Sequence, residues 1–266
     1  MRQDLVSVVI CSIEPDKYTN VTANYSRLLA RQPFEVIGIH DARSLAEGYS
    51  RGIAKSKGEI LILSHDDIRI LTSDFARRLA TQLATYDLIG IAGTTKVVGG
   101  SWLDAGDPYL YTLISSPQPE SNRLQTVLLG GEPLIVPGIQ ALDGVFMAMH
   151  RSVAEAVGFD SVNFDGFHLY DLDFSFRAYL TGYRLAVSRD IVLVHDSIGR
   201  YDEMWHQYVR RFNEKFRDRL PTAWKPQDGA RGSFFAGSDD EVLARCQPDK
   251  LAPILRQITQ ANAALA

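Results

Sequence analysis

Cysteine is scarce in this chain, with only Cys11 and Cys246 among 266 residues. Two cysteines so far apart neither build a disulfide framework nor match the spacing of a zinc site. The sequence also lacks any apolar run as long as a membrane span or the hydrophobic region of a signal peptide. These absences predict a soluble protein of the reducing cytoplasm, whose contact with the inner face of a membrane is at most peripheral.

Common phosphate-binding signatures are missing as well. The sequence contains neither a Walker A motif nor G-x-G-x-x-G, so kinase, NTPase and dinucleotide-binding functions have no support. Positive charge is not in excess, because 28 Lys and Arg residues face 32 Asp and Glu residues and leave a net charge of -4. That balance argues against a nucleic-acid partner. A hydrophobic content of 45% is ordinary for a globular protein of this length.

What the first third of the chain does contain is an alternation of strand and helix patterns. Apolar or β-branched runs predict strands at residues 5–11, 34–40, 60–63 and 88–92. Helical spacing predicts helices at residues 19–31, 44–57 and 74–86, the second of which begins with the capping-box pattern Ser-Leu-Ala-Glu. This order predicts an α/β fold with a mostly parallel sheet and right-handed crossovers.

The rest of the chain is less regular. Residues 94–142 are rich in glycine pairs and proline, which predicts an inserted region of long loops and a hairpin that shapes a substrate cleft. Strands are also predicted at residues 144–149 and in the run that ends at His195. Helices are predicted from residue 152, at residues 170–181 and at residues 201–220. We divide the chain into a domain of residues 1–220 and a C-terminal helical tail of residues 221–266.

Two adjacent carboxylates, Asp66 and Asp67, directly follow a strand without polar alternation. Such a strand is buried on both faces, and its end in an open α/β sheet is where ligands bind. Paired carboxylates there are costly unless a cation lies between them, and hard oxygen ligands suit Mg²⁺ and Mn²⁺. The ordinary alternative is a solvated turn or a helix cap, but Ser73 or Asp74 is better placed to cap the next helix.

Other polar residues end or begin neighbouring elements. Asp41 follows the second strand, Asp171 begins a helix, and His195 ends the last strand. Each alone has an ordinary explanation, such as an N-cap or a loop histidine. A parallel sheet brings these positions to one edge, so together they predict a ligand site.

The order of these motifs resembles that of family 2 glycosyltransferases, which have the GT-A fold. The resemblance covers about residues 5–220 and rests on Ile13-Glu14, the stretch 58–67, Asp143-Gly144, the stretch 170–177 and His195. It implies a Rossmann-like, mostly parallel sheet flanked by helices, with residues 1–220 as the catalytic domain. It also implies a nucleotide-diphosphate sugar as donor and a hydroxyl of a glycan, or of a lipid-linked or protein-linked saccharide, as acceptor.

The resemblance also implies roles for particular residues. The donor would be contacted by Ser12, Glu14, Asp41 and Asp66. The metal ion, Mn²⁺ or Mg²⁺, would be held by Asp66, Asp67 and His195. Asp171 would be the catalytic base that deprotonates the acceptor hydroxyl.

Two departures from the family pattern stand out. Ser64 occupies the first acidic position of the metal motif, which leaves open whether Asp66 or Asp67 binds the metal. Tyr170 replaces the Glu of the Glu-Asp pair and leaves the base, Asp171, in place. At the start of a helix, we expect this aspartate to stay ionised because the helix dipole favours its charge.

The chemistry of sugar transfer agrees with these roles. A metal ion bridging the diphosphate stabilises the leaving group, and a carboxylate accepts the acceptor proton during attack. A single base opposite the leaving group gives one displacement with inversion. A non-catalytic module that binds a nucleotide sugar or glycan is the alternative from another class.

Other enzyme classes fit the sequence less well. Residues 48–52 match the G-x-S-x-G pattern of serine hydrolases, but Ser50 would lie inside a predicted helix rather than after a strand. A phosphatase would need a nucleophilic aspartate after the first strand, and residues 8–12 contain none. Both functions are therefore disfavoured.

The helix at residues 201–220 combines an aromatic stripe with basic residues. Its spacing predicts an amphipathic helix whose aromatic side chains join the core. A more specific hypothesis is that Arg210, Arg211 and Lys215 meet a phosphate of the donor or of a lipid-linked acceptor at a membrane surface. Trp102, in the inserted region, is a candidate for stacking on an acceptor sugar.

Overall fold

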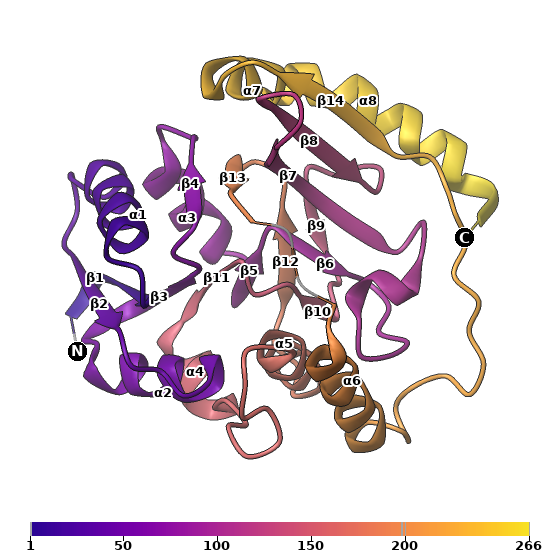
Figure 1. Cartoon of the computed structure of the whole chain (residues 1–266). Helices are drawn as coiled ribbons and strands as arrows, with labels where there is room; N and C mark the ends of the chain where they lie inside the picture. The colour runs from indigo at the N-terminus through magenta and orange to yellow at the C-terminus, as the bar shows by residue number, and fades with distance from the viewer. Residues whose placement is uncertain (1, 198, 200, 266) are drawn as a thin grey trace.

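The computed structural model of the chain describes residues 2–197, 199 and 201–265 (Figure 1). It contains two β-sheets with helices packed around them, which confirms the predicted α/β class. Among the helices of these residues, none is both long enough and apolar enough to cross a bilayer.

The first sheet contains the βα units predicted from the sequence. Its strands, in spatial order, are β2 (Phe34–Ile39), β1 (Arg2–Cys11), β3 (Gly58–Ser64), β11 (Phe146–His150), β5 (Leu88–Gly90), β12 (Leu185–Ser188) and β9 (Ile135–Pro137). β1 pairs in parallel with β2 and β3, so these three strands end at the same edge of the sheet. The turn that carries Asp66 and Asp67 lies at that edge.

This sheet is mixed, which the strand and helix alternation did not predict. β11 runs antiparallel between β3 and β5, and β9 runs antiparallel to β12. The physical reason is that the chain leaves β5, forms the inserted region, and returns to the first sheet at the edge where β3 and β5 end. β11 therefore starts from that edge and runs back without a crossover helix.

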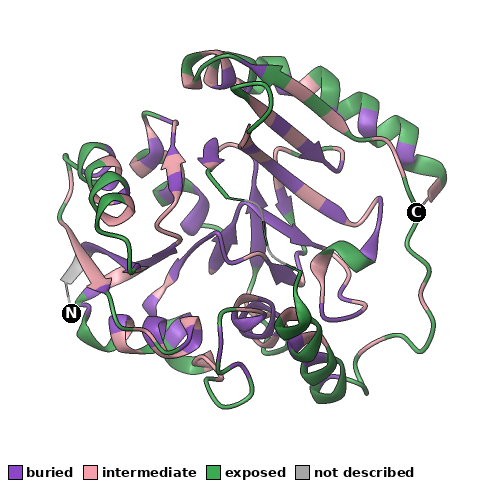
Figure 2. Ribbon diagram, viewed as in Figure 1, coloured by how far each residue is buried: buried purple, intermediate pink, exposed green. Residues whose placement is uncertain are grey.

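Helices cover both faces of the first sheet. One core cluster joins Val8 and Ile62 of the strands to side chains of α1 (Pro15–Leu28) and α3 (Phe75–Leu83). The other cluster joins Val9 and Leu63 to α2 (Leu45–Lys55), α4 (Arg151–Val157) and α5 (Tyr170–Leu180). Figure 2 shows the buried residues concentrated in these strands and on the inner faces of the helices. Burial on both faces explains why β3 has no polar alternation.

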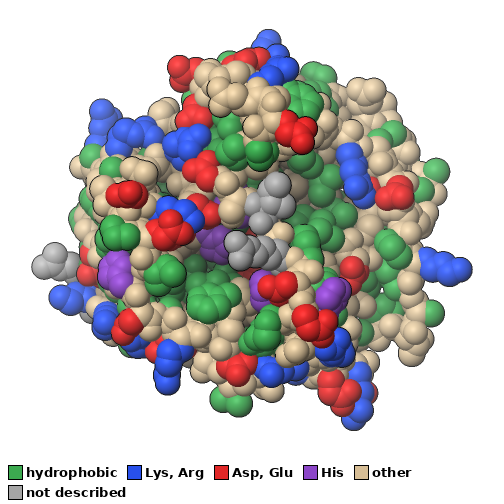
Figure 3. Space-filling view, in the orientation of Figure 1, with side chains coloured by type: hydrophobic (Ala, Val, Ile, Leu, Met, Phe, Trp, Pro, Cys, Tyr) green, Lys and Arg blue, Asp and Glu red, His purple; other side chains and the backbone are tan. Residues whose placement is uncertain are grey.

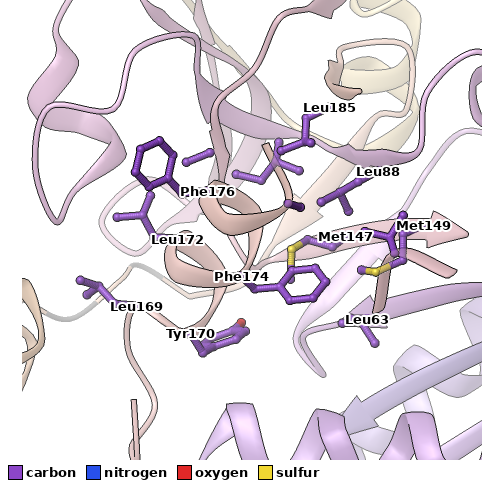
Figure 4. Packing of buried hydrophobic residues seen from close by; sticks show 14 of the residues in the cluster. Leu63, Leu88, Met147, Met149, Leu169, Tyr170, Leu172, Phe174, Phe176 and Leu185 are labelled. Carbon is purple, nitrogen blue, oxygen red and sulfur yellow. The ribbon is translucent and has the colours of Figure 1, made fainter. Parts of the chain in front are cut away.

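The packing of α5 against the sheet fixes the start of this helix. Figure 4 shows Phe174 of α5 directed towards Met147, close to the strands that carry Leu63 and Met149. Phe174 and both methionines are completely buried. Because close-packed interiors resist displacement, this packing holds the first residues of α5 in place.

The second sheet is formed mostly by the inserted region. Its strands are β10 (Ala141–Leu142), β6 (Ala92–Thr94), β7 (Leu110–Gln118), β13 (Leu193–His195) and β4 (Ile68–Ile70). β8 (Arg123–Leu129) also pairs with β7, and β14 (Gly232–Ala236) pairs with β8. β7 and β8 form the predicted hairpin. A short 3-10 helix, η1 (Trp102–Ala105), precedes them. The region that looked like long loops therefore contains most of a sheet.

The C-terminal segment crosses the outside of the second sheet (Figure 1). After α6 (Glu203–Lys215) it contributes β14, α7 (Asp239–Arg245), α8 (Pro248–Asn262) and the short 3-10 helix η2 (Ala263–Leu265). Leu251 and Leu255 of α8 pack against Leu128 of β8. The predicted C-terminal helix is confirmed as α8, whereas β14 was not predicted; the domain boundary at residue 220 stays a prediction.

Candidate active site

The turn after β3 directs its two carboxylates to different neighbours. Oδ2 of Asp66 accepts a hydrogen bond of 2.6 Å from Oγ of Ser12, which follows β1. Oδ1 of Asp67 lies 3.3 Å from Nε2 of His195 at the end of β13. Adjacent carboxylates therefore belong to different parts of the site.

Pairing between β4 and β13 explains how His195 reaches this turn. The two strands are antiparallel, with His195 opposite Ile68. The amide of Asp196 donates a hydrogen bond of 2.9 Å to the carbonyl oxygen of Asp67. This short ladder holds the end of β13 beside the turn after β3.

Three side chains at this point form a group that fits a metal ion. His65, Asp67 and His195 each offer one ligand atom, and these atoms lie within 4.8 Å of one another. Nδ1 of His65 is 3.9 Å from Oδ1 of Asp67, and the two imidazole rings have centroids 5.5 Å apart. Two imidazoles and a carboxylate are a donor set for divalent transition metals. Asp66 lies outside this group, and His65 was missed in the sequence although it stands between Ser64 and Asp66.

The electrostatics of this group suit a cation. Burial alone raises the pKa of Asp67, but the hydrogen bond and charge of His195 outweigh it, and the pKa lies well below its usual range. Burial and the neighbouring His195 lower the pKa of His65. At neutral pH the carboxyl is therefore charged and His65 is neutral, which are the forms that bind metals.

Asp171 is the first acidic residue of α5. Its Oδ2 accepts a hydrogen bond of 2.6 Å from the amide of Gly144. Burial, followed by the charge of the nearby Asp143, raises the pKa of Asp171 to about 7. The expectation that the helix dipole keeps this group ionised is wrong, because burial and Asp143 outweigh the amide hydrogen bonds. A carboxylate with this pKa is a stronger base than an ordinary aspartate.

One cavity connects the histidines with Asp171. Its volume is about 390 Å³, and its lining includes His65, His195, Asp143 and Asp171. Its aromatic wall is formed by Trp102, Phe167, Tyr201 and Trp205. Figure 3 shows hydrophobic side chains gathered in the hollow at the middle of this face. A proton acceptor and the candidate metal group therefore face the same space.

Two residues that line this cavity, Trp102 and Asp143, are in contact with each other. Nε1 of Trp102 donates a hydrogen bond of 3.1 Å to Oδ2 of Asp143, so this indole is anchored by the acid. Asp143 was part of a motif in the sequence but not a candidate site residue. Its influence on Asp171 depends on the distance between the two carboxyls, which no sequence pattern reports.

The remaining predicted donor contacts lie on the β1 side of the turn. Glu14 is exposed, and its carboxylate is 3.0 Å from Nζ of Lys17. Asp41 forms a bidentate pair with Arg51 of α2, at 2.7 and 3.2 Å. Ser12 contacts both Asp66 and the backbone of Glu14. Contact of these residues with a nucleoside stays a prediction.

The structure contradicts the serine hydrolase hypothesis. Ser50 lies inside α2, and its hydroxyl donates a hydrogen bond of 2.8 Å to the carbonyl oxygen of Ala46. A nucleophile elbow requires the serine directly after a strand. This serine is therefore an ordinary helical residue.

The basic residues of α6 are engaged with carboxylates. Arg210 pairs with Glu203 at 3.0 Å and Arg211 with Asp165 at 2.6 Å. Nζ of Lys215 lies 2.6 Å from both Asp160 and Asp173. The predicted aromatic core stripe is confirmed for Tyr208, Phe212 and Phe216, which are buried, whereas Trp205 is half-buried and lines the cavity. These ion pairs do not favour the hypothesis that the three cations bind a phosphate.

Comparison with known proteins adds to this geometry. Residues 7–219 match a family described as "Glycosyltransferase like family". No curated protein sequence matches the chain. Among solved structures, mannosyltransferase PcManGT from Pyrobaculum calidifontis in complex with GDP-Man and Mn²⁺ is 14% identical, with a TM-score of 0.52 over 100% of this chain and 75% of that one. GalNAc-T7 with UDP, GalNAc and Mn²⁺ is 13% identical, with a TM-score of 0.51 over 81% of this chain and 49% of that one. These similarities confirm the predicted GT-A fold.

Proposed function

The chain belongs to the glycosyltransferase-like family that matches residues 7–219, and we propose that it is a metal-dependent inverting glycosyltransferase. In this proposal it moves a sugar from a nucleotide-diphosphate sugar to a hydroxyl of a glycan or of a lipid-linked or protein-linked saccharide. The main support is the shared cavity: His65 and His195 of the candidate metal group and the base Asp171 all line it.

Asp67 and His195 are the residues that would hold Mn²⁺ or Mg²⁺. Bound there, the cation would neutralise charge on the departing diphosphate. The lowered pKa of Asp67 keeps its carboxylate charged for this purpose at neutral pH. Asp66, which hydrogen-bonds to Ser12, would instead hold the nucleoside part of the donor, together with Glu14 and Asp41.

Asp171 would accept the proton of the acceptor hydroxyl. The hydrogen bond from the amide of Gly144 holds this carboxyl group in place beside the cavity. A base with a pKa of about 7 is half ionised at neutral pH and gains driving force for proton transfer. Because this base stands apart from the metal group, attack from its side displaces the diphosphate with inversion.

The aromatic wall of the cavity would receive the acceptor. Trp102 and Trp205 supply apolar faces, and sugars present apolar C–H faces to aromatic rings. The hydrogen bond between Trp102 and Asp143 holds the indole in one orientation. We place this activity in the synthesis of a polysaccharide or glycoconjugate on the cytoplasmic side of a membrane.

A screen of donors tests this function. UDP-, GDP- and dTDP-sugars are added to the protein with Mn²⁺, with Mg²⁺ or with EDTA, and the melting temperature is measured. We expect one nucleotide sugar to stabilise the protein only when a divalent cation is present. NMR of the product formed with a saccharide acceptor then reports the anomeric configuration, for which we expect inversion.

Release of nucleoside diphosphate from the nucleotide sugar that stabilises the protein separates the non-catalytic alternative. A binding module would be stabilised by a nucleotide sugar but would release no nucleoside diphosphate, with or without acceptor. Retention of configuration in the product would contradict the single-displacement mechanism. Failure of every nucleotide sugar to bind would contradict the proposed donor class.

A further inference from the structure

The two departures from the family pattern are in contact with the same histidine. Tyr170, in place of the usual Glu, is 4% exposed, and its hydroxyl lies 3.2 Å from Nε2 of His65. Ser64, in place of the usual acid, donates a hydrogen bond of 2.8 Å from Oγ to the carbonyl oxygen of His65. Ser64 is completely buried and turned to the backbone, so His65 is the side chain that this segment offers to the cavity.

The hydroxyl of Tyr170 has a second partner that determines its direction. It donates a hydrogen bond of 3.3 Å to the carbonyl oxygen of Gly144. A tyrosine hydroxyl has one proton, so towards His65 its oxygen acts as acceptor. Nε2 of His65 then carries the imidazole proton, and Nδ1 keeps its lone pair. Nδ1 is the nitrogen that lies 3.9 Å from Oδ1 of Asp67.

The absence of a side chain at Gly144 makes room for the hydroxyl of Tyr170. A Cβ atom at this position would lie 2.2 Å from the hydroxyl oxygen of Tyr170. Only glycine leaves room for the hydroxyl to reach both the carbonyl oxygen and the imidazole. The same glycine also donates its amide to Asp171, so one residue supports both halves of the site.

We propose that Tyr170 is a positioning residue that holds His65 as a third metal ligand beside Asp67 and His195, and that the site therefore prefers Mn²⁺ to Mg²⁺. This inference rests on the metal dependence proposed above. Hydrogen bonding to the distal nitrogen of a ligating histidine fixes its tautomer and orientation. Two nitrogen donors and one carboxylate favour transition metals, whereas Mg²⁺ prefers oxygen ligands.

Metal binding without substrate tests the inference. The affinity for Mn²⁺ is measured by electron paramagnetic resonance of the free ion, and Mg²⁺ is then added as competitor. For the unmodified protein we expect Mn²⁺ to bind more tightly than Mg²⁺. Tyr170→Phe keeps the ring and removes the hydroxyl, so we expect it to weaken Mn²⁺ binding by roughly 10–100-fold.

A matched control is available in α6. Tyr208 is also buried and hydrogen-bonds through its hydroxyl to Asp165 at 3.0 Å, outside the metal group. Tyr208→Phe should leave Mn²⁺ affinity unchanged. Nitrogen NMR of the unmodified, metal-free protein adds a test that needs no variant, because His65 should carry its proton on Nε2.

Each outcome has a distinct meaning. Equal Mn²⁺ affinity in the unmodified protein and Tyr170→Phe, or a proton on Nδ1 of His65, would overturn the role of Tyr170. Equal affinity for Mn²⁺ and Mg²⁺ would overturn the preference for the transition metal. Absence of any Mn²⁺ or Mg²⁺ binding to the unmodified protein would instead overturn the metal dependence on which the inference rests.

Discussion

The turn after β3 and the start of α5 each present an aspartate near the same cavity, but the two side chains differ in their neighbours. Asp67 lies 3.3 Å from the imidazole of His195, and its pKa is lowered. Asp171 is half-buried near another carboxylate, Asp143, and its pKa is raised to about 7. The difference shows how one residue type acquires two roles: a permanently charged group suits a cation, and a group that titrates near neutrality suits proton transfer.

Among the variants that test this comparison, Asp171→Asn should have the largest effect on activity. Asparagine keeps the shape and an oxygen for the Gly144 amide but accepts no proton, so we expect sugar transfer to fall by about 10²–10⁴-fold. Stabilisation by the donor with Mn²⁺ should persist, and release of nucleoside diphosphate measures the rate. Exposed Asp218→Asn is the control. Full transfer activity in Asp171→Asn would show that the base lies elsewhere.

Asp67→Asn should affect metal binding, which is the role that the comparison gives to Asp67. Loss of the carboxylate removes the charged ligand. We therefore expect Mn²⁺ affinity to fall by at least roughly 10–100-fold, which is the typical loss when a residue that hydrogen-bonds to a metal ligand is replaced. High Mn²⁺ concentrations should restore part of the activity, whereas they should not rescue Asp171→Asn. Metal titrations of both variants check this, and rescue of both or of neither would remove the distinction.

The pH dependence follows from the raised pKa of Asp171. The base works when ionised, so with a pKa of about 7 we expect kcat/KM to rise about tenfold between pH 6 and pH 8.

The folded state holds a proton on Asp171 that the unfolded state releases near its ordinary pKa. This group therefore lowers the free energy of unfolding as pH rises through about 4 to 7. Denaturant titrations at several pH values measure this decrease, and Asp171→Asn should abolish it. The same decrease of unfolding free energy with pH in both proteins would contradict the prediction.

Asp66→Asn should have the smallest effect. Its carboxylate accepts a charge-assisted hydrogen bond from Ser12. Asparagine keeps an oxygen that can accept this bond but removes the charge that strengthens it, so we expect a loss of about 1 kcal/mol of stability. We expect a several-fold higher KM for the donor and unchanged Mn²⁺ affinity, because Asp66 lies outside the metal group. Ser12→Ala is the matched variant. Weakened Mn²⁺ binding in Asp66→Asn would place both carboxylates on the metal.

Much of the fold and part of the site were predictable. The apolar run before Ser64 indicated a strand buried on both faces, and the alternating patterns indicated helices around a sheet. The positions of Asp67, Asp171 and His195 at the ends of elements indicated a ligand site, since such ends converge. These features depend on local pattern and on the general geometry of α/β folds.

The rest depends on contacts between distant residues. The opposite directions of Asp66 and Asp67, the pairing of Tyr170 with His65, and the influence of Asp143 on Asp171 arise from side-chain packing. β14 was missed because its partner β8 is remote in the chain, and its short sequence has no clear alternation. Periodicity carries no information on such contacts.

The ladder between β4 and β13 has a consequence for the order of folding. His65 and Asp67 come from the first third of the chain, and His195 comes from its last third, after the whole inserted region. A folding intermediate that contains only the early βα units would lack one imidazole of the metal group. Tight capture of Mn²⁺ should therefore report completion of the long-range topology, and added metal should slow unfolding more than it accelerates the first folding steps.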